Sequence, residues 1–412
     1  MVEAASSLDG VKIDVISRIA YANLLASAGV GLAIAYTQLL VPVEAGFLAI
    51  SLLTTAYYGF HVIGLNVFGK LLDRAGGKAL PIVFIGLLVV AVINVLLPFF
   101  ENPLQLGVLR AVQGLFWAAF IPATSAMVTS LSTPVFRGRA MGIYNRGASI
   151  GMLLGFFVGG FLADALSFKA TFLMGALLVG VSAVTLIMSR PKAGFNVLDE
   201  ETVKSTPSIS TPRIVTPSIA PLYLCLFLRH TGAGGIWALF SVYLSSLGAS
   251  KTQIGFIYAV NLVTQTAFMV QAGKLSDRFG RKITLTIALL LSALTFIAYA
   301  LAPNAYLIVP VQVVLGVSWS MLITSSTALA GDLAPSERRA EVMGRLFTAL
   351  SLGSVVGPVI SGFVSSVTGI RIYMVLAAIQ SLAASIVASL IKEPNIKSIP
   401  SGRLRANLAF NP

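Results

Sequence analysis

The chain has 412 residues, of which 57% are apolar and 10% are charged, and its formal net charge is +13. A soluble domain carries roughly 25% charged residues, so this composition excludes a soluble globule of this size and favours a protein embedded in lipid. The excess of Lys and Arg is explained better by membrane topology and anionic lipid head groups than by nucleic-acid binding, which we do not expect.

Twelve apolar runs follow one another along the chain, with lengths close to the ~20 residues that cross a bilayer. They do not alternate in polarity as the ~10-residue strands of a membrane barrel do, and continuous helices satisfy their own backbone hydrogen bonds in lipid. We therefore predict an all-α integral membrane protein with twelve transmembrane helices. The runs lie at 16–39, 46–69, 79–100, 103–130, 139–164, 168–189, 219–247, 252–273, 283–302, 305–330, 342–366 and 371–391.

Lys and Arg are distributed unequally between the two sides of this predicted topology. With the N-terminus in the cytoplasm, 21 of them fall in cytoplasmic segments, whereas the outer loops hold three, Lys169, Lys251 and Arg371. This bias predicts a multi-pass protein of the cytoplasmic membrane with both termini in the cytoplasm. Residues 1–10 lack the basic start of a signal peptide, so the first helix is expected to direct insertion.

A basic ten-residue phrase occurs twice, and each copy is expected to form a short loop between two apolar runs. Residues 69–78 read Gly-Lys-Leu-Leu-Asp-Arg-Ala-Gly-Gly-Lys, and residues 273–282 read Gly-Lys-Leu-Ser-Asp-Arg-Phe-Gly-Arg-Lys. Internal repetition of this kind predicts two related membrane bundles. Further matches occur at an offset of 202, where Gly151, Gly155, Gly160 and Trp117 correspond to Gly353, Gly357, Gly362 and Trp319.

The repeat also predicts the domain organisation. Residues 1–190 and 218–395 are expected to form one six-helix bundle each. A segment rich in Ser, Thr and Pro joins them at 191–217, and such a composition is typical of an extended connector that lets two bundles rock. Residues 396–412 are expected to form a polar cytoplasmic tail.

The sequence carries no signature of catalysis or of a metal site. Cys225 is its single cysteine and it has two histidines, and we find no Ser-His-Asp pattern, phosphate loop or dinucleotide fingerprint. We therefore expect neither an enzyme nor a cofactor. Energy for transport has to come from a solute or ion gradient.

These patterns resemble the major facilitator superfamily of secondary transporters over about residues 16–392. The resemblance rests on the doubled phrase, on Arg110-x-x-Gln113-Gly114 in the fourth run, on residues 137–142 and on the six-plus-six division. It implies alternating access, in which two bundles rock about a central cavity, and a cytoplasmic gate whose glycines pack closely and whose acids face a helix N-terminus of the opposite half. The first copy has Gly77 where the second has Arg281, so the gate is expected to be asymmetric. The implied gating residues are Gly69, Asp73, Arg74, Gly273, Asp277, Arg278 and Arg281.

Polar and aromatic side chains within the predicted helices are the candidate solute-binding residues. Polar groups in lipid are costly and tend to be functional, and none at mid-helix is acidic. A cavity lined by these groups is net positive, which favours an anionic or polar solute over a cationic drug. For both histidines, ordinary packing is the simpler interpretation. The candidates are Asn23, His61, Arg110, Gln113, Trp117, Arg146, Arg229, His230, Trp237, Asn261, Gln265, Gln312 and Trp319.

We therefore predict a secondary active transporter, expected to be a monomer in the bilayer, that moves a small organic solute by alternating access, with an anion favoured. A proton-coupled multidrug-type exporter is the alternative, and a lipid transporter or a membrane sensor without transport are weaker ones. The fifth run lacks the Gly-Pro typical of the family's antiporters, which weakens the case for export. Import and export both remain open.

Overall fold

The computed structural model describes residues 2–75, 79–132, 136–189, 219–335 and 338–392. Within these ranges every regular element is a helix, and eleven helical stretches are long and apolar enough to cross a membrane. The one predicted run not among these eleven is 219–247, which corresponds to α8 (Ala220–Ser246); this helix is long enough but carries Arg229 and His230. The predicted linker and tail lie outside the described residues.

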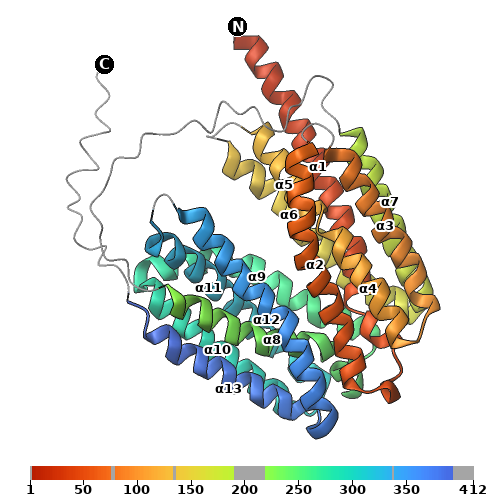
Figure 1. The fold of residues 1–412 in the computed structure, drawn as a ribbon, viewed down its shortest axis with the longest axis vertical. Helices are drawn as coiled ribbons and strands as arrows, with labels where there is room; N and C mark the ends of the chain where they lie inside the picture. The colour runs from red at the N-terminus through yellow and green to blue at the C-terminus, as the bar shows by residue number, and fades with distance from the viewer. Residues whose placement is uncertain (1, 76–78, 133–135, 190–218, 336–337, 393–412) are drawn as a thin grey trace.

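The first half of the chain forms a bundle of six spans, which we call the N half (Figure 1). Short 3-10 turns extend two of the spans and connect the first to the second: η1 (Thr37–Leu40), η2 (Val43–Ala45) and η4 (Leu97–Phe99). The helices are α1 (Val2–Ile34), α2 (Phe47–Ala75), α3 (Ala79–Leu96), α4 (Pro103–Trp117), α5 (Phe120–Leu131), α6 (Arg137–Ala165) and α7 (Phe168–Met188). The predicted fourth run is thus two helices, because the chain breaks at residues 118 and 119.

The second half repeats this arrangement and is called the C half. Besides α8 it contains α9 (Lys251–Phe279), α10 (Arg281–Leu301), η6 (Ala305–Leu307), α11 (Ile308–Leu333), α12 (Arg339–Thr368) and α13 (Ile370–Ser389). Equivalent pairs pack in each half: α1 on α6 and α7 corresponds to α8 on α12 and α13, and α2 on α4 corresponds to α9 on α11. The predicted six-plus-six architecture is therefore confirmed.

Local sequence explains where the helices begin. Asn102 accepts a hydrogen bond from the backbone N–H of Leu104 at 2.9 Å, and a proline follows it at the first position of α4. Ser250 and Gln253 form a reciprocal capping box at the start of α9, which satisfies donors that the first turn leaves unpaired. Gly280, with a φ of 98°, turns the chain between α9 and α10.

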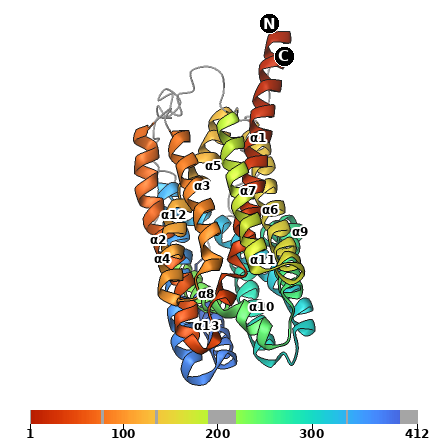
Figure 2. The same ribbon diagram turned by 90° about the vertical axis from the view of Figure 1, so that its right-hand side faces the viewer.

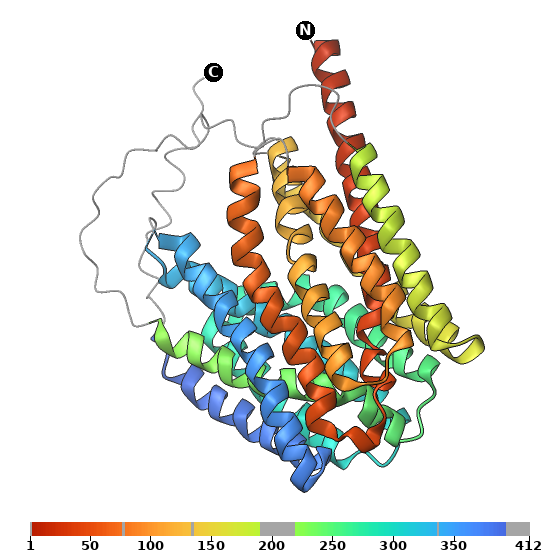
Figure 3. The ribbon, with the colours of Figure 1, turned by 45° about the vertical axis from the view of Figure 1, so that its right-hand side comes forward.

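The two halves meet through two symmetric helix pairs, α6 with α9 and α2 with α12. They meet at an angle and diverge toward the end that carries the N-terminus (Figures 1 and 3). Figure 2 shows the same two bundles after a 90° turn. We call the end that carries the N-terminus the motif end, because the doubled phrase lies there. The opposite end, where α6 ends and α9 begins, is called the sealed end.

Most of the described part of the doubled phrase is helical, contrary to our expectation of a loop. Its first copy continues α2 to Ala75 and its second continues α9 to Phe279. Leu, Lys and Arg are good helix formers, and the second copy meets its first breaker at Gly280. Arg74 and Arg278 therefore lie in the last turns of α2 and α9, where they interact favourably with the helix dipole.

Candidate functional site

A central cavity of about 530 Å³ lies between the two halves, and it collects many of the predicted residues. Tyr58 and Met152 contribute to it from the N half. The C half supplies the other described lining residues, namely Arg229, His230, Ala233, Gly234, Trp237, Asn261, Gln265, Leu315, Trp319 and Ser354. Most of its wall is apolar or aromatic, and Arg229 is the one charged side chain among the described lining residues.

Arg229 is held in the C half without a described acidic partner. The residue is 3% exposed, and its Nε donates a hydrogen bond to Ser292 Oγ at 3.2 Å. It lies 5.1 Å from the ring centre of Trp319 and 5.9 Å from that of Phe296. Cation–π contacts recover part of the cost of burying this charge, but no described carboxylate neutralises it.

The neighbouring polar groups leave hydrogen-bonding capacity unused. The His230 ring lies 5.5 Å from that of Trp319, and its buried Nδ1 has no hydrogen-bond partner among the described residues. Asn261 donates to the Gln312 carbonyl at 3.2 Å and accepts from Gln265. The buried side-chain amide of Gln312 likewise has no described partner, so the C half offers several polar atoms near the cavity.

The polar candidates of the N half form a separate network behind the cavity. Arg110 is 2% exposed; it donates to Gln113, which donates in turn to Asn94 Oδ1 at 2.6 Å. Its guanidinium lies 4.2 Å from the Tyr57 ring centre, and His61 stacks on that ring. None of these side chains is among the described residues that line the cavity, although Tyr58, next to Tyr57 in the chain, is.

Three further candidates lie away from the central cavity. Asn23 donates to the carbonyl of Tyr144 at 3.1 Å and so joins α1 to α6. Trp117 is buried against Phe120 in the core of the N half. Arg146 is exposed on α6 and is not among the described lining residues.

Sequence reasoning missed several residues of the cavity wall. Tyr58, Met152 and Ser354 are not unusual residues for a membrane helix. Met152 and Ser354 are nevertheless separated by 202 positions, which is the offset of the internal repeat. The repeat therefore contained a signal for this pair, because equivalent residues of related halves face the same axis.

At the sealed end, a carboxylate joins α6 to the start of α9. Asp164 accepts hydrogen bonds from the backbone N–H of Thr252 at 2.7 Å and of Lys251 at 3.2 Å, and from the Thr252 hydroxyl at 2.7 Å. The Lys251 ammonium lies 3.8 Å from the same carboxylate. A negative group at a helix N-terminus is stabilised by unpaired N–H groups and by the helix dipole, so Asp164 latches the two halves together.

Small residues let the backbones of the two halves touch beside this latch. A Cβ at Gly160 would lie 2.2 Å from the Lys251 carbonyl oxygen, and one at Gly255 would lie 2.2 Å from the Phe156 carbonyl oxygen. Tyr36 lies beside this contact: its hydroxyl donates within the N half to the Phe156 carbonyl at 2.7 Å, and it reaches the Lys251 carbonyl of the C half at 3.5 Å. The seal between α6 and α9 is thus a close backbone packing as well as a polar contact.

The symmetric pair, α2 with α12, is sealed by weaker contacts. Thr55 Oγ1 donates to the Val355 carbonyl and the backbone N–H of Leu48 donates to Ser366 Oγ, both at 3.3 Å. Gly362 lies against Leu48, where a Cβ would approach to 2.8 Å. The described hydrogen bonds and ion pairs between the halves all lie on the sealed-end side of the central cavity.

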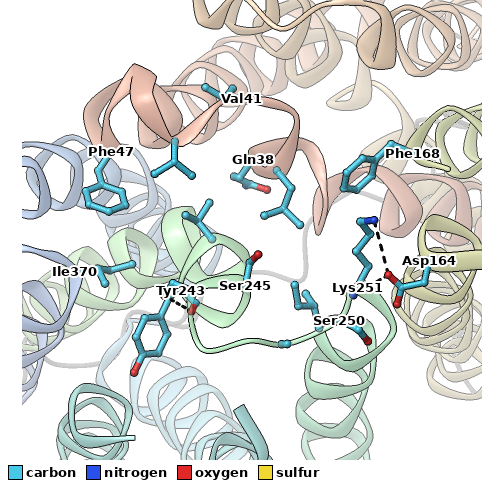
Figure 4. Close-up of a pocket in the computed structure, with 16 residues that line it drawn as sticks. Gln38, Val41, Phe47, Asp164, Phe168, Tyr243, Ser245, Ser250, Lys251 and Ile370 are labelled. Carbon is cyan, nitrogen blue, oxygen red and sulfur yellow. Dashed lines mark hydrogen bonds and ion pairs between the residues drawn. The ribbon is translucent and has the colours of Figure 1, made fainter. Parts of the chain in front are cut away.

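A second cavity of about 490 Å³ lies within the seal, and Figure 4 shows the side chains around it. Asp164 and Lys251 flank one side of it and Gln38 lies over its middle. Gln38 donates to Thr54 at 3.3 Å, while its Oε1 has no described hydrogen-bond partner. The sealed end therefore contains a cavity, and the polar contact of Asp164 with Lys251 lies at one side of it.

Among the described residues, the gating candidates at the motif end do not bridge the halves in this structure. Arg281 pairs with Asp332 and donates to the Ala328 carbonyl at 3.2 Å, and it lies 3.9 Å from Asp277, all within the C half. Arg278 is exposed beside Phe279.

Our expectation of close packing at the phrase glycines is also not met here. No atom lies within 4 Å of a Cβ built at Gly69 or Gly273, because the halves are apart at this end. Arg74 is exposed. The side chain of Asp73 and the whole of Gly77 lie outside the described residues.

Residues 19–218 and 222–409 match the model of the Major Facilitator Superfamily. The chain belongs to this superfamily. The multidrug resistance protein MdtG of Proteus mirabilis is 27% identical over 321 residues, which cover 76% of this chain and 78% of that protein. The quinolone resistance protein NorA of Staphylococcus aureus is 29% identical over 181 residues, which cover 44% of this chain and 46% of that protein.

Solved structures of the superfamily share the fold. A bacterial homologue of the human lysosomal transporter Spinster aligns with a TM-score of 0.74 and 15% identity, over 92% of this chain and 96% of that one. The nucleoside transporter NupG aligns with a TM-score of 0.76 and 13% identity, over 91% and 98% of the two chains. At such identities the likeness concerns the fold alone. This member of the superfamily is a multi-pass membrane transporter of a small molecule.

Proposed function

We propose that this transporter carries a small organic solute across the cytoplasmic membrane by alternating access, with the central cavity as its binding site. The observation that supports this best is the uneven distribution of contacts: the described hydrogen bonds between the halves lie on the sealed-end side of the cavity. By the positive-inside rule the motif end faces the cytoplasm. The structure then corresponds to a state that is open toward the cytoplasm and closed toward the outside.

The opposite state requires the motif end to close. Because α2 packs on α12 and α9 on α6 across the interface, closure brings the end of α9 toward the start of α6. Asp277 is exposed now, and in the closed arrangement it faces the positive end of α6. The first phrase copy faces the start of α12 in the same way. Both copies therefore contribute to contact between the halves only in the state in which the motif end is closed.

Spin-label distances test the alternation. One pair, K70C with T348C, reports on the motif end, and a second pair, V43C with T368C, reports on the sealed end; each pair joins the N half to the C half. We replace Cys225 by Ala in both and measure the distributions in nanodiscs. Alternating access predicts two populations in each pair, with the motif-end distance short whenever the sealed-end distance is long. Distances that stay single, or that lengthen together, contradict the proposal.

A multidrug-type exporter is the second candidate, since relatives of this chain are named multidrug and quinolone resistance proteins. The apolar wall of the central cavity is compatible with it, and Met152 is a flexible side chain that adapts to varied ligands. Uptake into inside-out vesicles distinguishes the candidates. An exporter of broad specificity moves several unrelated dyes and drugs inward in such vesicles, whereas a dedicated solute carrier moves members of one chemical class.

A further inference from the structure

We infer that the central cavity binds an amphipathic organic monoanion, whose anionic group is held by Arg229 and His230 of the C half and whose apolar body rests against Tyr58 and Met152 of the N half. The inference rests on the proposed function, because it assigns the solute class of the same cavity. It goes further by dividing the binding task unequally between the two halves.

The first step is the unbalanced charge of Arg229. Burying an ion is costly unless it is paired and hydrogen-bonded. Arg229 has one described side-chain hydrogen bond, to Ser292, and in the described part of the chain no carboxylate pairs with it. An anion in the cavity supplies the missing charge, and a cation adds to the repulsion. The charge of the cavity therefore selects the sign of the solute.

The second step is the number of donors. A carboxylate has two oxygens and a guanidinium presents a fork of N–H groups that matches them. Beside Arg229, the Nδ1 atom of His230 is buried and lacks a described hydrogen-bond partner. The His230 imidazole lines the same cavity, and its other ring nitrogen, as an N–H, provides one further donor next to the guanidinium. One anionic group is satisfied by this set, whereas a second would have no described cation to meet it, which favours a monoanion.

The third step is the remainder of the wall. Trp237 and Trp319 line the C-half side and Tyr58 and Met152 the N-half side. The Trp237 ring is held 4.8 Å from that of Tyr258, and rigid aromatic rings favour stacking with flat apolar groups. A cavity of about 530 Å³ falls in the range that takes drug-sized ligands. Inorganic phosphate or acetate leaves this apolar surface uncovered, so the solute has an apolar and preferably aromatic body.

The division between halves gives the site a mechanical role. The anion is anchored on α8 of the C half, while Tyr58 on α2 and Met152 on α6 belong to the half that moves relative to it. Rocking then changes the apolar contacts and keeps the ionic one. The solute stays with the C half through the cycle, and the N half alternately covers and uncovers its body.

Three isosteric probes test the solute class on the purified full chain: 2-naphthoate, the neutral 2-naphthalenemethanol and the cationic 2-naphthylmethylammonium. We expect saturable binding of naphthoate at least about tenfold tighter than that of the other two, as a buried charge pair implies. Arg229→Gln removes this preference and Arg229→Lys keeps part of it. The control Arg371→Gln removes a C-half arginine that bonds to the Ala302 carbonyl outside the cavity, and it keeps the full preference.

The outcomes separate this inference from the proposed function. Equal or tighter binding of the cation, absence of saturable naphthoate binding, or an unchanged preference in Arg229→Gln overturns the assigned solute class. Gel filtration and thermal unfolding of each variant show whether a loss reflects misfolding, and Arg229→Lys still reports on the site if Arg229→Gln does not fold. Alternation of the two spin-label pairs is measured without solute, so it can stand when the anion preference fails.

Discussion

Replacing Asp164 by Asn should weaken the sealed state without touching the central cavity. The carboxylate accepts three hydrogen bonds from the first residues of α9. Asn keeps one acceptor oxygen and puts an N–H₂ donor where the second oxygen stood, so part of this set is lost together with the charge at the helix N-terminus. In the proposed cycle this contact exists only in the state in which the sealed end is closed, so its loss should change the balance of states rather than the fold.

The size of the effect follows from the exposure of the latch. Hydrogen bonds to a charged group contribute about 1.5–3 kcal/mol when buried, but the Asp164 side chain is 31% exposed, which reduces the gain by solvent screening. We take a net loss of about 1.5 kcal/mol, or roughly a tenfold change in the equilibrium constant. A sealed state populated at ~99% then falls to ~90%.

The V43C/T368C spin-label pair measures the sealed population directly as the fraction of short distances, and the unsealed population as the fraction of long ones. Lys251→Met is the matched comparison, because it removes the ion pair at 3.8 Å and leaves the backbone N–H groups in place. An exposed ion pair contributes roughly 0–1 kcal/mol, so its shift should be smaller than that of Asp164→Asn. If Asp164→Asn changes the ratio of sealed to unsealed population by less than about twofold, or less than Lys251→Met does, the latch is not the main polar contact of the seal.

Three further changes probe other contacts. Gly160→Ala places a Cβ 2.2 Å from the Lys251 carbonyl oxygen, so it should hold the sealed end open and abolish transport while the purified chain stays folded; wild-type spin-label distances would contradict this. Arg281→Gln breaks the pair with Asp332 and should lower the Tm by a few degrees, given about 1–2 kcal/mol for a partly exposed pair; an unchanged Tm would show that the pair is idle. Asp277→Asn should slow transport severalfold with no change in Tm, since this exposed acid acts only when the motif end closes, and normal transport would remove it from the gate.

Much of the fold was predictable because its signals are local or repeated. Apolar length located the spans, and the offset of 202 residues identified two equivalent halves. The ends of the helices were less predictable. The doubled phrase was expected to be a loop, yet α2 and α9 continue into it and end at Ala75 and Phe279. The reason is that hydropathy falls where a helix leaves the lipid, whereas the helix itself ends where its backbone hydrogen bonds end.

The site was only partly predictable, since residue type does not reveal the direction in which a helix faces. Arg110 and Arg229 are both buried arginines, but one lies within the N half and the other lines the cavity. Trp117 and Trp319 occupy equivalent positions in the repeat, and only Trp319 is in the cavity wall. The symmetry of the sequence therefore predicts the scaffold, while the binding surface depends on how each half departs from it.

The seal has a consequence for how such a transporter can change over evolutionary time. At Gly160 and Gly362, which are equivalent in the repeat, the halves meet through backbone or through the nearest side-chain atoms. Closure of the outer end therefore depends little on which large side chains surround it. The cargo, by contrast, is chosen by side chains of a cavity that these glycines do not line. Substitutions in the central cavity can therefore change the transported solute while the sealed end still closes.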